Sequence, residues 1–145
     1  MKFLLPIDGS RAALAAVRHL LQLRLAGLDA SCVLVNVQEP ATLYEVVVAQ
    51  DPETINAIKR DAGADMLEEA EAMLGGAGVN YESEVAAGTP ATLVLELLEN
   101  YRCDAVLVGS HDLGEVTMAL LHRSPVPVTL VRVPDLDAEA ADQAA

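Results

Sequence analysis

The fold is decided by a stretch that runs Ala105-Val-Leu-Val-Gly-Ser-His-Asp-Leu-Gly114, continues as Glu115-Val-Thr-Met-Ala-Leu-Leu-His-Arg123 and closes with Ser124-Pro-Val-Pro-Val-Thr-Leu-Val-Arg-Val133. The pattern predicts a buried strand, a turn that contains glycine, a short helix, a proline break and a second buried strand. These elements form a parallel βαβ unit. Its turn lies at the carboxyl end of a strand, where open α/β sheets bind ligands.

The rest of the chain repeats this alternation of strands and helices. Lys2–Ile7 is a short apolar run that ends in Asp8-Gly9-Ser10, and Ser10 can cap the helix that follows. The segment Gln38–Asp51 has no regular pattern and is either a mobile flap or a partner surface. Periodicity and turn signals predict the other elements, which are strands at Ser31–Val37 and Val79–Ala86 and helices at 11–26, 52–74 and 90–101.

We expect the helix at 52–74 to expose its acids and to bury one apolar stripe. That stripe comprises Ile55, Ile58, Ala62, Met66, Leu67, Ala70 and Leu74.

Five strands that alternate with four helices predict an open parallel five-stranded α/β sheet, Rossmann-like, with helices on both faces. We predict the strand order 3-2-1-4-5, in which Asp8-Gly9-Ser10 faces Gly109-Ser110-His111 across one crevice. Strands 1, 2, 4 and 5 are apolar on both sides and should be almost wholly buried. The alternating pattern of Val79–Ala86 instead predicts an exposed edge strand.

The composition predicts one domain and excludes several classes of protein. A chain of 145 residues can bury a core without disulfides or metal. The net charge of −13, from 22 acidic and 9 basic residues, argues against a nucleic-acid partner, which needs clustered Lys and Arg. No apolar run approaches the roughly 18 residues of a membrane span. We therefore expect a cytoplasmic protein that contacts no membrane.

Neither the cysteines nor the histidines predict a site. Cys32 and Cys103 each lie beside a predicted buried strand and are expected to be reduced packing thiols. His19, His111 and His122 are too scattered to form a metal-ligand set. The catalytic motifs GxSxG, HExxH and GxxxxGK followed by Ser or Thr are absent, so we expect no enzyme.

At its two turns the sequence resembles the universal stress protein family, in its single-domain form. The matching pieces span nearly the whole chain and are Leu5-Pro6-Ile7-Asp8-Gly9-Ser10, Val35-Asn36-Val37, Gly88-Thr89-Pro90, Cys103–His111 and Pro125-Val-Pro-Val128. The resemblance implies a family domain over residues 1–133 and a Rossmann-like fold. Residues 134–145 are small and acidic, and we expect them to form a disordered tail.

The resemblance also implies a nucleotide site in one branch of the family and none in another. In the first branch Asp8 would reach the ribose, the backbone of Val37 would contact adenine and Gly109 would open the phosphate loop. The full set that the resemblance implies is Pro6, Asp8, Gly9, Val37, Gly109, Ser110, His111 and Gly114. Turn formation and capping of the first helix explain Asp8 equally well, and we expect His111 to be a loop residue.

The phosphate loop departs from the family pattern. ATP-binding members carry G-x2-G-x9-G followed by Ser or Thr after the fourth strand. Here Asp112 takes the place of the second glycine, the loop is several residues shorter, and the best match to the final pair is Gly114-Glu115. Two acids at the position of the phosphates predict that ATP binds weakly or not at all, with magnesium-dependent binding as the alternative.

Two functions remain open from the sequence. The chain is either a nucleotide-binding stress sensor or, as we favour, a non-enzymatic stress-response protein that binds no nucleotide and contacts an unknown protein partner. The resemblance implies a homodimer made by antiparallel pairing of the last strand. An unprotected apolar edge of this kind favours such pairing, and it comprises Val128, Leu130, Val131 and Val133.

Overall fold

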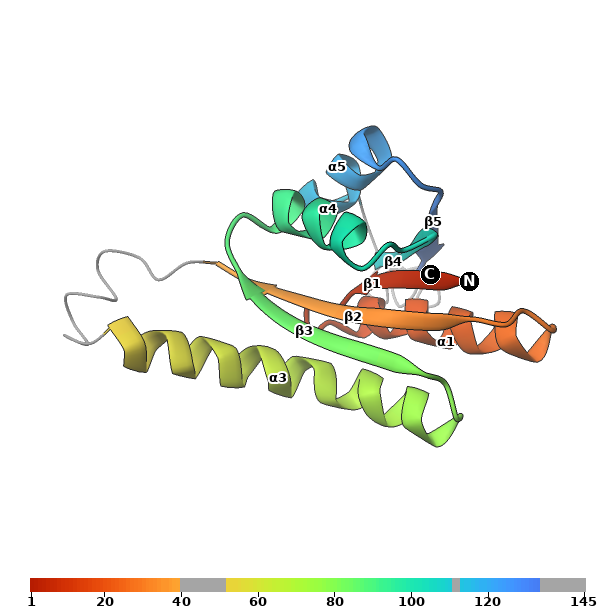
Figure 1. The fold of residues 1–145 in the computed structure, drawn as a ribbon, viewed down its shortest axis with the longest axis horizontal. Coiled ribbons are helices and arrows are strands. Elements are labelled where there is room, and N and C mark those ends of the chain that lie inside the picture. Colours follow the sequence, from red (N-terminus) through yellow and green to blue (C-terminus); the bar gives the residue numbers. More distant parts are fainter. Residues whose placement is uncertain (40–51, 111–112, 134–145) are drawn as a thin grey trace, which may run out of the picture.

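The computed structural model describes residues 1–39, 52–110 and 113–133 of the chain (Figure 1). The predicted tail at 134–145, most of the irregular segment at 38–51, and His111 with Asp112 lie outside the described residues. The elements in chain order are β1 Lys2–Pro6, α1 Arg11–Leu25, β2 Ser31–Gln38, α3 Pro52–Gly76, β3 Tyr81–Ala87, α4 Pro90–Asn100, β4 Ala105–Ser110, α5 Glu115–Arg123 and β5 Val128–Arg132.

The five strands form one parallel sheet in the order β3-β2-β1-β4-β5, which confirms the predicted topology. β1 lies in the centre, where Leu4 pairs with Val33 of β2 on one side and with Val106 of β4 on the other. The order reverses between β1 and β4, so the loops after these strands lie together at the carboxyl edge of the sheet.

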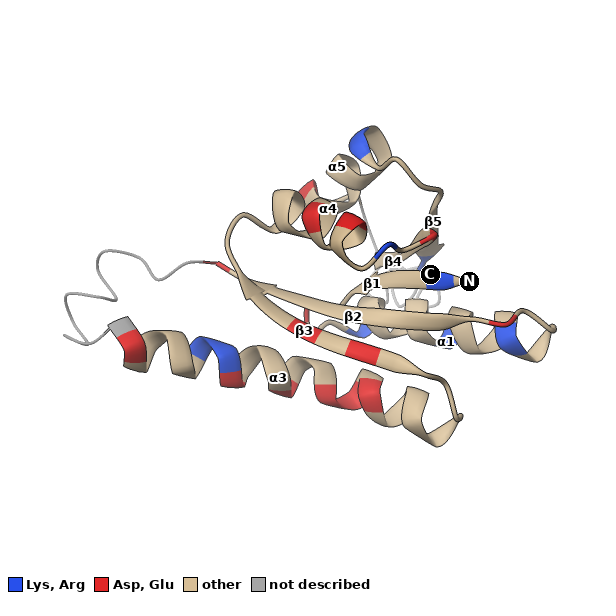
Figure 2. Ribbon diagram, in the orientation of Figure 1, with Lys and Arg blue, Asp and Glu red and all other residues tan. Residues whose placement is uncertain are grey.

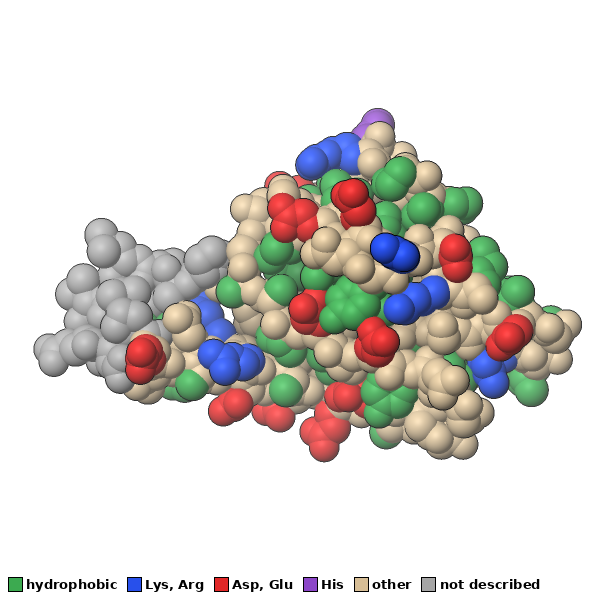
Figure 3. Space-filling model, in the orientation of Figure 1, with side chains coloured by type: hydrophobic (Ala, Val, Ile, Leu, Met, Phe, Trp, Pro, Cys, Tyr) green, Lys and Arg blue, Asp and Glu red, His purple; other side chains and the backbone are tan. Residues whose placement is uncertain are grey.

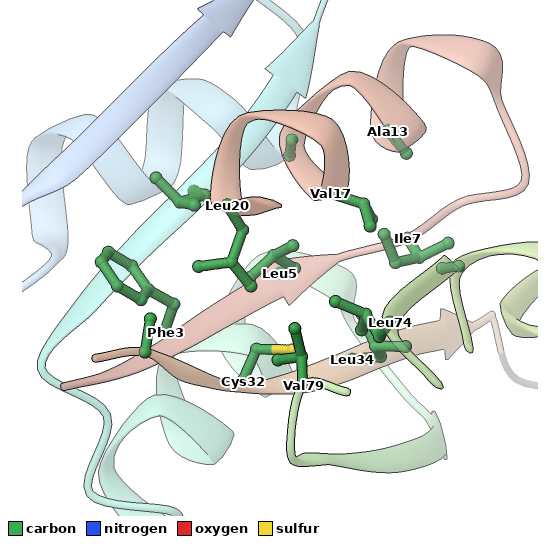
Figure 4. Close-up of a cluster of buried hydrophobic side chains, with 14 of the residues drawn as sticks. Phe3, Leu5, Ile7, Ala13, Val17, Leu20, Cys32, Leu34, Leu74 and Val79 are labelled. Carbon is green, nitrogen blue, oxygen red and sulfur yellow. The ribbon is translucent and has the colours of Figure 1, made fainter. Parts of the chain in front are cut away.

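Each face of the sheet packs against its own pair of helices. The face that carries Phe3 and Leu5 of β1, with Ile7 directly after the strand, packs on α1 and α3 (Figure 4). The opposite face, which includes Leu4 of β1, packs on α4 and α5. Leu4 and Leu5 have no exposed surface, as expected for a strand covered by helices on both sides.

The two edge strands of the sheet, β3 and β5, are less buried than the three central strands. β3 is an exposed edge strand, as predicted. The prediction that β5 is almost wholly buried is wrong, because Thr129 and Arg132 are exposed and the other residues of β5 are only half-buried. β5 pairs with β4 alone, so its outer edge has no neighbouring strand among the described residues.

The buried stripe of α3 is narrower than predicted. Ile58 and Met66 are 62% and 38% exposed, whereas Gly63 is buried. A Cβ on Gly63 would lie 2.5 Å from Val85 Cγ1 and 2.7 Å from Asn36 Oδ1. The helix thus approaches β2 and β3 along a line that passes through a glycine, which a count of apolar residues cannot detect.

The acids spread over the surface. Asp and Glu occur along α3, β3 and α4 (Figure 2), and carboxylates gather along the edge of the molecule that α3 forms (Figure 3). Within the described ranges no helix is both long enough and apolar enough to cross a membrane.

Both cysteines are free and buried, as predicted. Burial raises the pKa of the Cys32 thiol to about 12, and proximity to Cys103 adds to the effect. Burial also raises the pKa of Cys103, to about 11, although Lys2 opposes the shift. Both thiols therefore stay protonated in the folded protein at pH values where free thiols ionise.

We expect the free energy of unfolding to fall as the pH rises above about 9, because the unfolded chain then releases thiol protons that the folded chain retains. Urea unfolding between pH 7.5 and 10.5 measures this loss. The variant that combines Cys32→Ala with Cys103→Ala should be less stable throughout and should show a smaller fall. An equal pH dependence in both proteins would contradict the assignment to the thiols.

Candidate functional site

A cleft of about 370 Å³ opens at the carboxyl ends of β1, β2 and β4, at the reversal of strand order. Its volume lies within the range of about 300 to 1,000 Å³ that is typical of ligand pockets. The lining residues are Pro6, Ile7, Asp8, Ala13, Val35, Val37, Glu39, Pro90, Val94, Val108, Gly109, Ser110, Gly114, Glu115, Val116 and Thr117.

The fold brings most of the predicted site residues to this cleft. Six of them line it, namely Pro6, Asp8, Val37, Gly109, Ser110 and Gly114. Gly9 does not line it, and His111 lies outside the described residues. The predicted crevice between the turns after the first and fourth strands therefore exists.

Asp8 forms the turn and also lies at the cleft. Its Oδ1 accepts hydrogen bonds from the Ser10 backbone N–H at 2.9 Å and from the Ser10 hydroxyl at 2.5 Å. Ser10 Oγ in turn accepts a hydrogen bond from the Ala13 N–H at 3.2 Å and caps α1. The two roles considered for Asp8 are compatible, because this exposed carboxylate supports the cap while it borders the cleft.

Gly9 is required by the turn itself. Its φ of +84° lies in the left-handed region, which favours glycine. A Cβ there would also lie 3.0 Å from Met66 Cγ of α3. The turn and the contact with α3 therefore explain this glycine without a ligand.

Gly109 is required by the packing of α1 on β4. A Cβ at this position would lie 1.9 Å from the Ala12 carbonyl oxygen and 3.3 Å from Ala16 N. Because Gly109 has no side chain, the first turns of α1 can lie against the end of β4. Gly114, in contrast, has open space where its Cβ would be and serves as the N-cap of α5.

The charges around the cleft are negative. Among the described lining residues the acids are Asp8, Glu39 and Glu115, and there is no Lys or Arg. Glu115 lies in the first turn of α5, and no side chain caps the free N–H groups of that helix. These N–H groups favour an anion, but the neighbouring carboxylate already provides negative charge there.

Asn36 holds the ends of β1 and β2 in place next to the cleft. The sequence analysis did not predict this role. It is 1% exposed, and its Nδ2 donates to the Ile7 carbonyl oxygen at 2.8 Å. Its Oδ1 accepts from Gln38 Nε2 at 2.6 Å. This side chain ties the ends of β1 and β2 together just before Asp8. A polar residue within the apolar run of β2 was the available signal, because a buried amide needs hydrogen-bond partners.

The described residues contain no cluster of three or more His, Cys, Asp and Glu side chains that could hold a metal ion. The walls of the cleft are largely apolar, and α4 contributes Pro90 and Val94 while α5 contributes Val116. Residues of these two helices were not predicted at the site, since a pattern of burial cannot distinguish a core contact from a cleft wall. The arrangement suits binding of a partly apolar ligand.

A five-stranded parallel sheet with a ligand-sized cleft at its reversal defines the open α/β class of binding domains. Residues 1–132 match the model of the universal stress protein family, and the chain therefore belongs to this family. The chain is 23% identical over 141 residues to the universal stress protein MJ0531 of Methanocaldococcus jannaschii, with 92% of this chain and 82% of the relative covered.

Solved structures of similar proteins share the fold. The hypothetical protein MJ0577 superposes with a TM-score of 0.77 at 21% identity, covering 92% of this chain and 96% of that chain. A universal stress protein family protein from Arabidopsis thaliana, At3g01520, solved with AMP bound, gives a TM-score of 0.70 at 20% identity and covers 94% and 93% of the two chains. At these identities the likeness establishes the fold alone.

We expect Gly109→Ala to destabilise the fold by about 1–3 kcal/mol or more, because the methyl group would overlap the Ala12 carbonyl unless α1 moved away from β4. Chemical denaturation measures the change. Gly75→Ala is the matched control. It lies in the last turn of α3 with nothing within 4 Å of its Cβ, and alanine there should be neutral or stabilise by up to about 1 kcal/mol. Equal stability of Gly109→Ala and the wild type would contradict the close approach.

Proposed function

We propose that this universal stress protein acts without catalysis, as a homodimer that contacts protein partners, and that its cleft does not hold a metal-free triphosphate. The observation that argues against a metal-free triphosphate is the charge of the cleft, where Asp8, Glu39 and Glu115 are the charged residues of the described lining. A triphosphate site ordinarily offers cations and free backbone N–H groups to the phosphates.

The repulsion between carboxylates and phosphates is comparable with the free energy of binding. A carboxylate about 4 Å from one phosphate charge costs about 1 kcal/mol in water and about 4 kcal/mol at an effective dielectric constant near 20. Binding with a micromolar dissociation constant corresponds to about −8 kcal/mol. Two carboxylates near a triphosphate can therefore remove much of this affinity, although solvent weakens the effect of an exposed acid such as Glu115.

The proposed dimer interface is the outer edge of β5. Val133 N donates to the Ser110 carbonyl, and the Pro127 carbonyl accepts from Val106 N, so these two residues direct their backbone groups toward β4. Backbone direction alternates along a strand, so Val128, Leu130 and Arg132 direct their N–H and C=O groups outward. No described strand pairs with this edge, so these groups can pair with the same strand of a second copy, in an antiparallel arrangement with two-fold symmetry.

We expect Leu130→Pro to weaken the dimer, because proline removes an outward N–H donor near the middle of the edge. Sedimentation velocity across micromolar concentrations measures the association. Leu130→Ala is the control, since it also shortens the side chain but retains the N–H group. A wild-type chain that remains monomeric at high concentration, or a Leu130→Pro variant that associates as tightly as Leu130→Ala, would refute the interface.

A second candidate function is the binding of an adenine nucleotide with fewer charges than ATP. The specific support is that Pro6, Asp8, Val37 and Gly109 line one cleft, together with the AMP in the Arabidopsis structure of the same fold. AMP carries less negative charge than ATP does, so the acids of the cleft repel it less. In this case the protein would be a nucleotide-binding sensor.

We expect calorimetry to show metal-free ATP binding no tighter than about 0.1–1 mM, because the repulsion subtracts a few kcal/mol from a micromolar site. Magnesium should improve the binding by bridging carboxylates and phosphates. The variant that combines Asp112→Gly with Glu115→Ser should gain affinity modestly. Glu96→Gln is the control, since Glu96 is an exposed acid of α4 that does not line the cleft.

Two results would separate the candidates. Sub-micromolar binding of metal-free ATP by the wild type would show that the acids of the cleft do not prevent triphosphate binding. Tight binding of AMP together with weak binding of ATP would favour the second candidate.

A further inference from the structure

A second groove, of about 440 Å³, lies between the C-terminal ends of α4 and α5. Cys103 precedes β4, and Pro125 and Val126 precede β5, so the groove lies at the amino edge of the sheet, opposite the cleft. Its lining residues are Leu95, Leu98, Glu99, Arg102, Cys103, Arg123, Pro125 and Val126.

The groove combines an apolar floor with a charged rim. Leu98 and Cys103 are buried, and Leu95 and Val126 are half-buried. The rim residues Glu99, Arg102, Arg123 and Pro125 are exposed. Half of the lining is thus open to solvent. Because its rim is open, the groove suits a segment of polypeptide that lies along it.

The two arginines of the rim are available to a ligand. Within the part of the chain that the structure describes, neither guanidinium has a hydrogen-bond or ion-pair partner, whereas Arg24 Nη1 donates to the Ala30 carbonyl at 2.8 Å. The chain has only 9 basic residues against 22 acidic ones, so two unpartnered arginines at one groove form a local positive site on an acidic protein.

Arg102 occupies a backbone position that glycine would fill better. It follows the C-cap of α4 with φ at +52°. Its N–H donates to the Glu99 carbonyl, and Cys103 N–H donates to the Leu98 carbonyl. This is the Schellman pattern, in which glycine usually takes the left-handed position. The left-handed backbone at this helix ending would favour glycine over arginine. A non-glycine residue with a left-handed backbone often lies at a functional site.

Charge complementarity identifies the occupant. We propose that this groove binds a short acidic segment of a partner protein, with the apolar side chains of the segment on the leucine floor and its carboxylates on Arg102 and Arg123. The net charge of −13 repels an acidic partner from the rest of the surface, so such a partner would bind at this groove in particular. Glu99 disfavours a carboxylate next to itself and so helps to fix the register of the segment.

The two arginines could instead serve only to stabilise the helices that they end. Arg123 lies in the last turn of α5 and Arg102 follows α4, where positive charge stabilises the C-terminal end of a helix. That role predicts a loss of stability when each charge is removed. Peptide affinity separates the two explanations. Arg102→Gly fits the backbone and should preserve the fold, so a role at the helix end alone predicts unchanged peptide binding, whereas a ligand contact predicts weaker binding.

The test uses the full chain and a fluorescein-labelled synthetic peptide in which leucines alternate with glutamates. Fluorescence anisotropy should show saturable binding to the wild type that weakens with salt. The variant that combines Arg102→Gly with Arg123→Gln should bind about tenfold or more weakly, as expected when charge-assisted contacts are lost. Arg18→Gln removes one exposed charge on α1, away from the groove, and should change little. A peptide with glutamine in place of glutamate should bind the wild type as weakly as the acidic peptide binds the double variant.

Three outcomes would overturn the proposal. The acidic peptide could fail to bind at up to about 1 mM, which is weaker than a specific contact of this size should be. The double variant could bind it as tightly as the wild type does. A synthetic peptide of residues 134–145 could displace it with higher affinity, which would assign the groove to this chain itself. The groove is separate from the cleft of the proposed function. Glu115→Ser and added ATP act at the opposite edge of the sheet and should leave peptide binding unchanged.

Discussion

The structure depends on the close approach of α1 to β4 at Gly109. A single methyl group on this residue would lie 1.9 Å from the Ala12 carbonyl oxygen. This contact places the beginning of α1, and with it the Asp8 turn, beside the carboxyl end of β4. The cleft at the reversal of the sheet exists because these two elements meet there. Gly109 therefore has a structural reason to be glycine, whether or not a phosphate ever lies near it.

Much of the fold could be predicted because β1, β2 and β4 are apolar on both faces and alternate with helices, which leaves few parallel topologies. The cleft followed from the same logic, since the loops after β1 and β4 must meet. Ile58, Met66 and β5 were misjudged because apolar character does not reveal which elements lie nearby. Asn36 and Arg102 were missed because their roles depend on distant backbone, at the Ile7 carbonyl and at the end of α4.

The charges divide the molecule into two sites of opposite character. The cleft at the carboxyl edge of the sheet is apolar with carboxylates around it. The groove at the amino edge is apolar with two arginines and one glutamate at its rim. In an acidic protein the first disfavours phosphates and the second favours acids. These two sites are the basis of our proposal that this stress protein contacts other proteins and holds no metal-free ATP.

The most direct test of the central claim, that the cleft holds no triphosphate without metal, is to purify the protein in a chelating buffer with no added nucleotide and measure its absorbance at 260 and 280 nm. The chain has no Trp and only three Tyr, so even a substoichiometric nucleotide would dominate the spectrum. The account predicts a spectrum of protein alone, with no nucleotide released on denaturation. One ATP released per chain would contradict it.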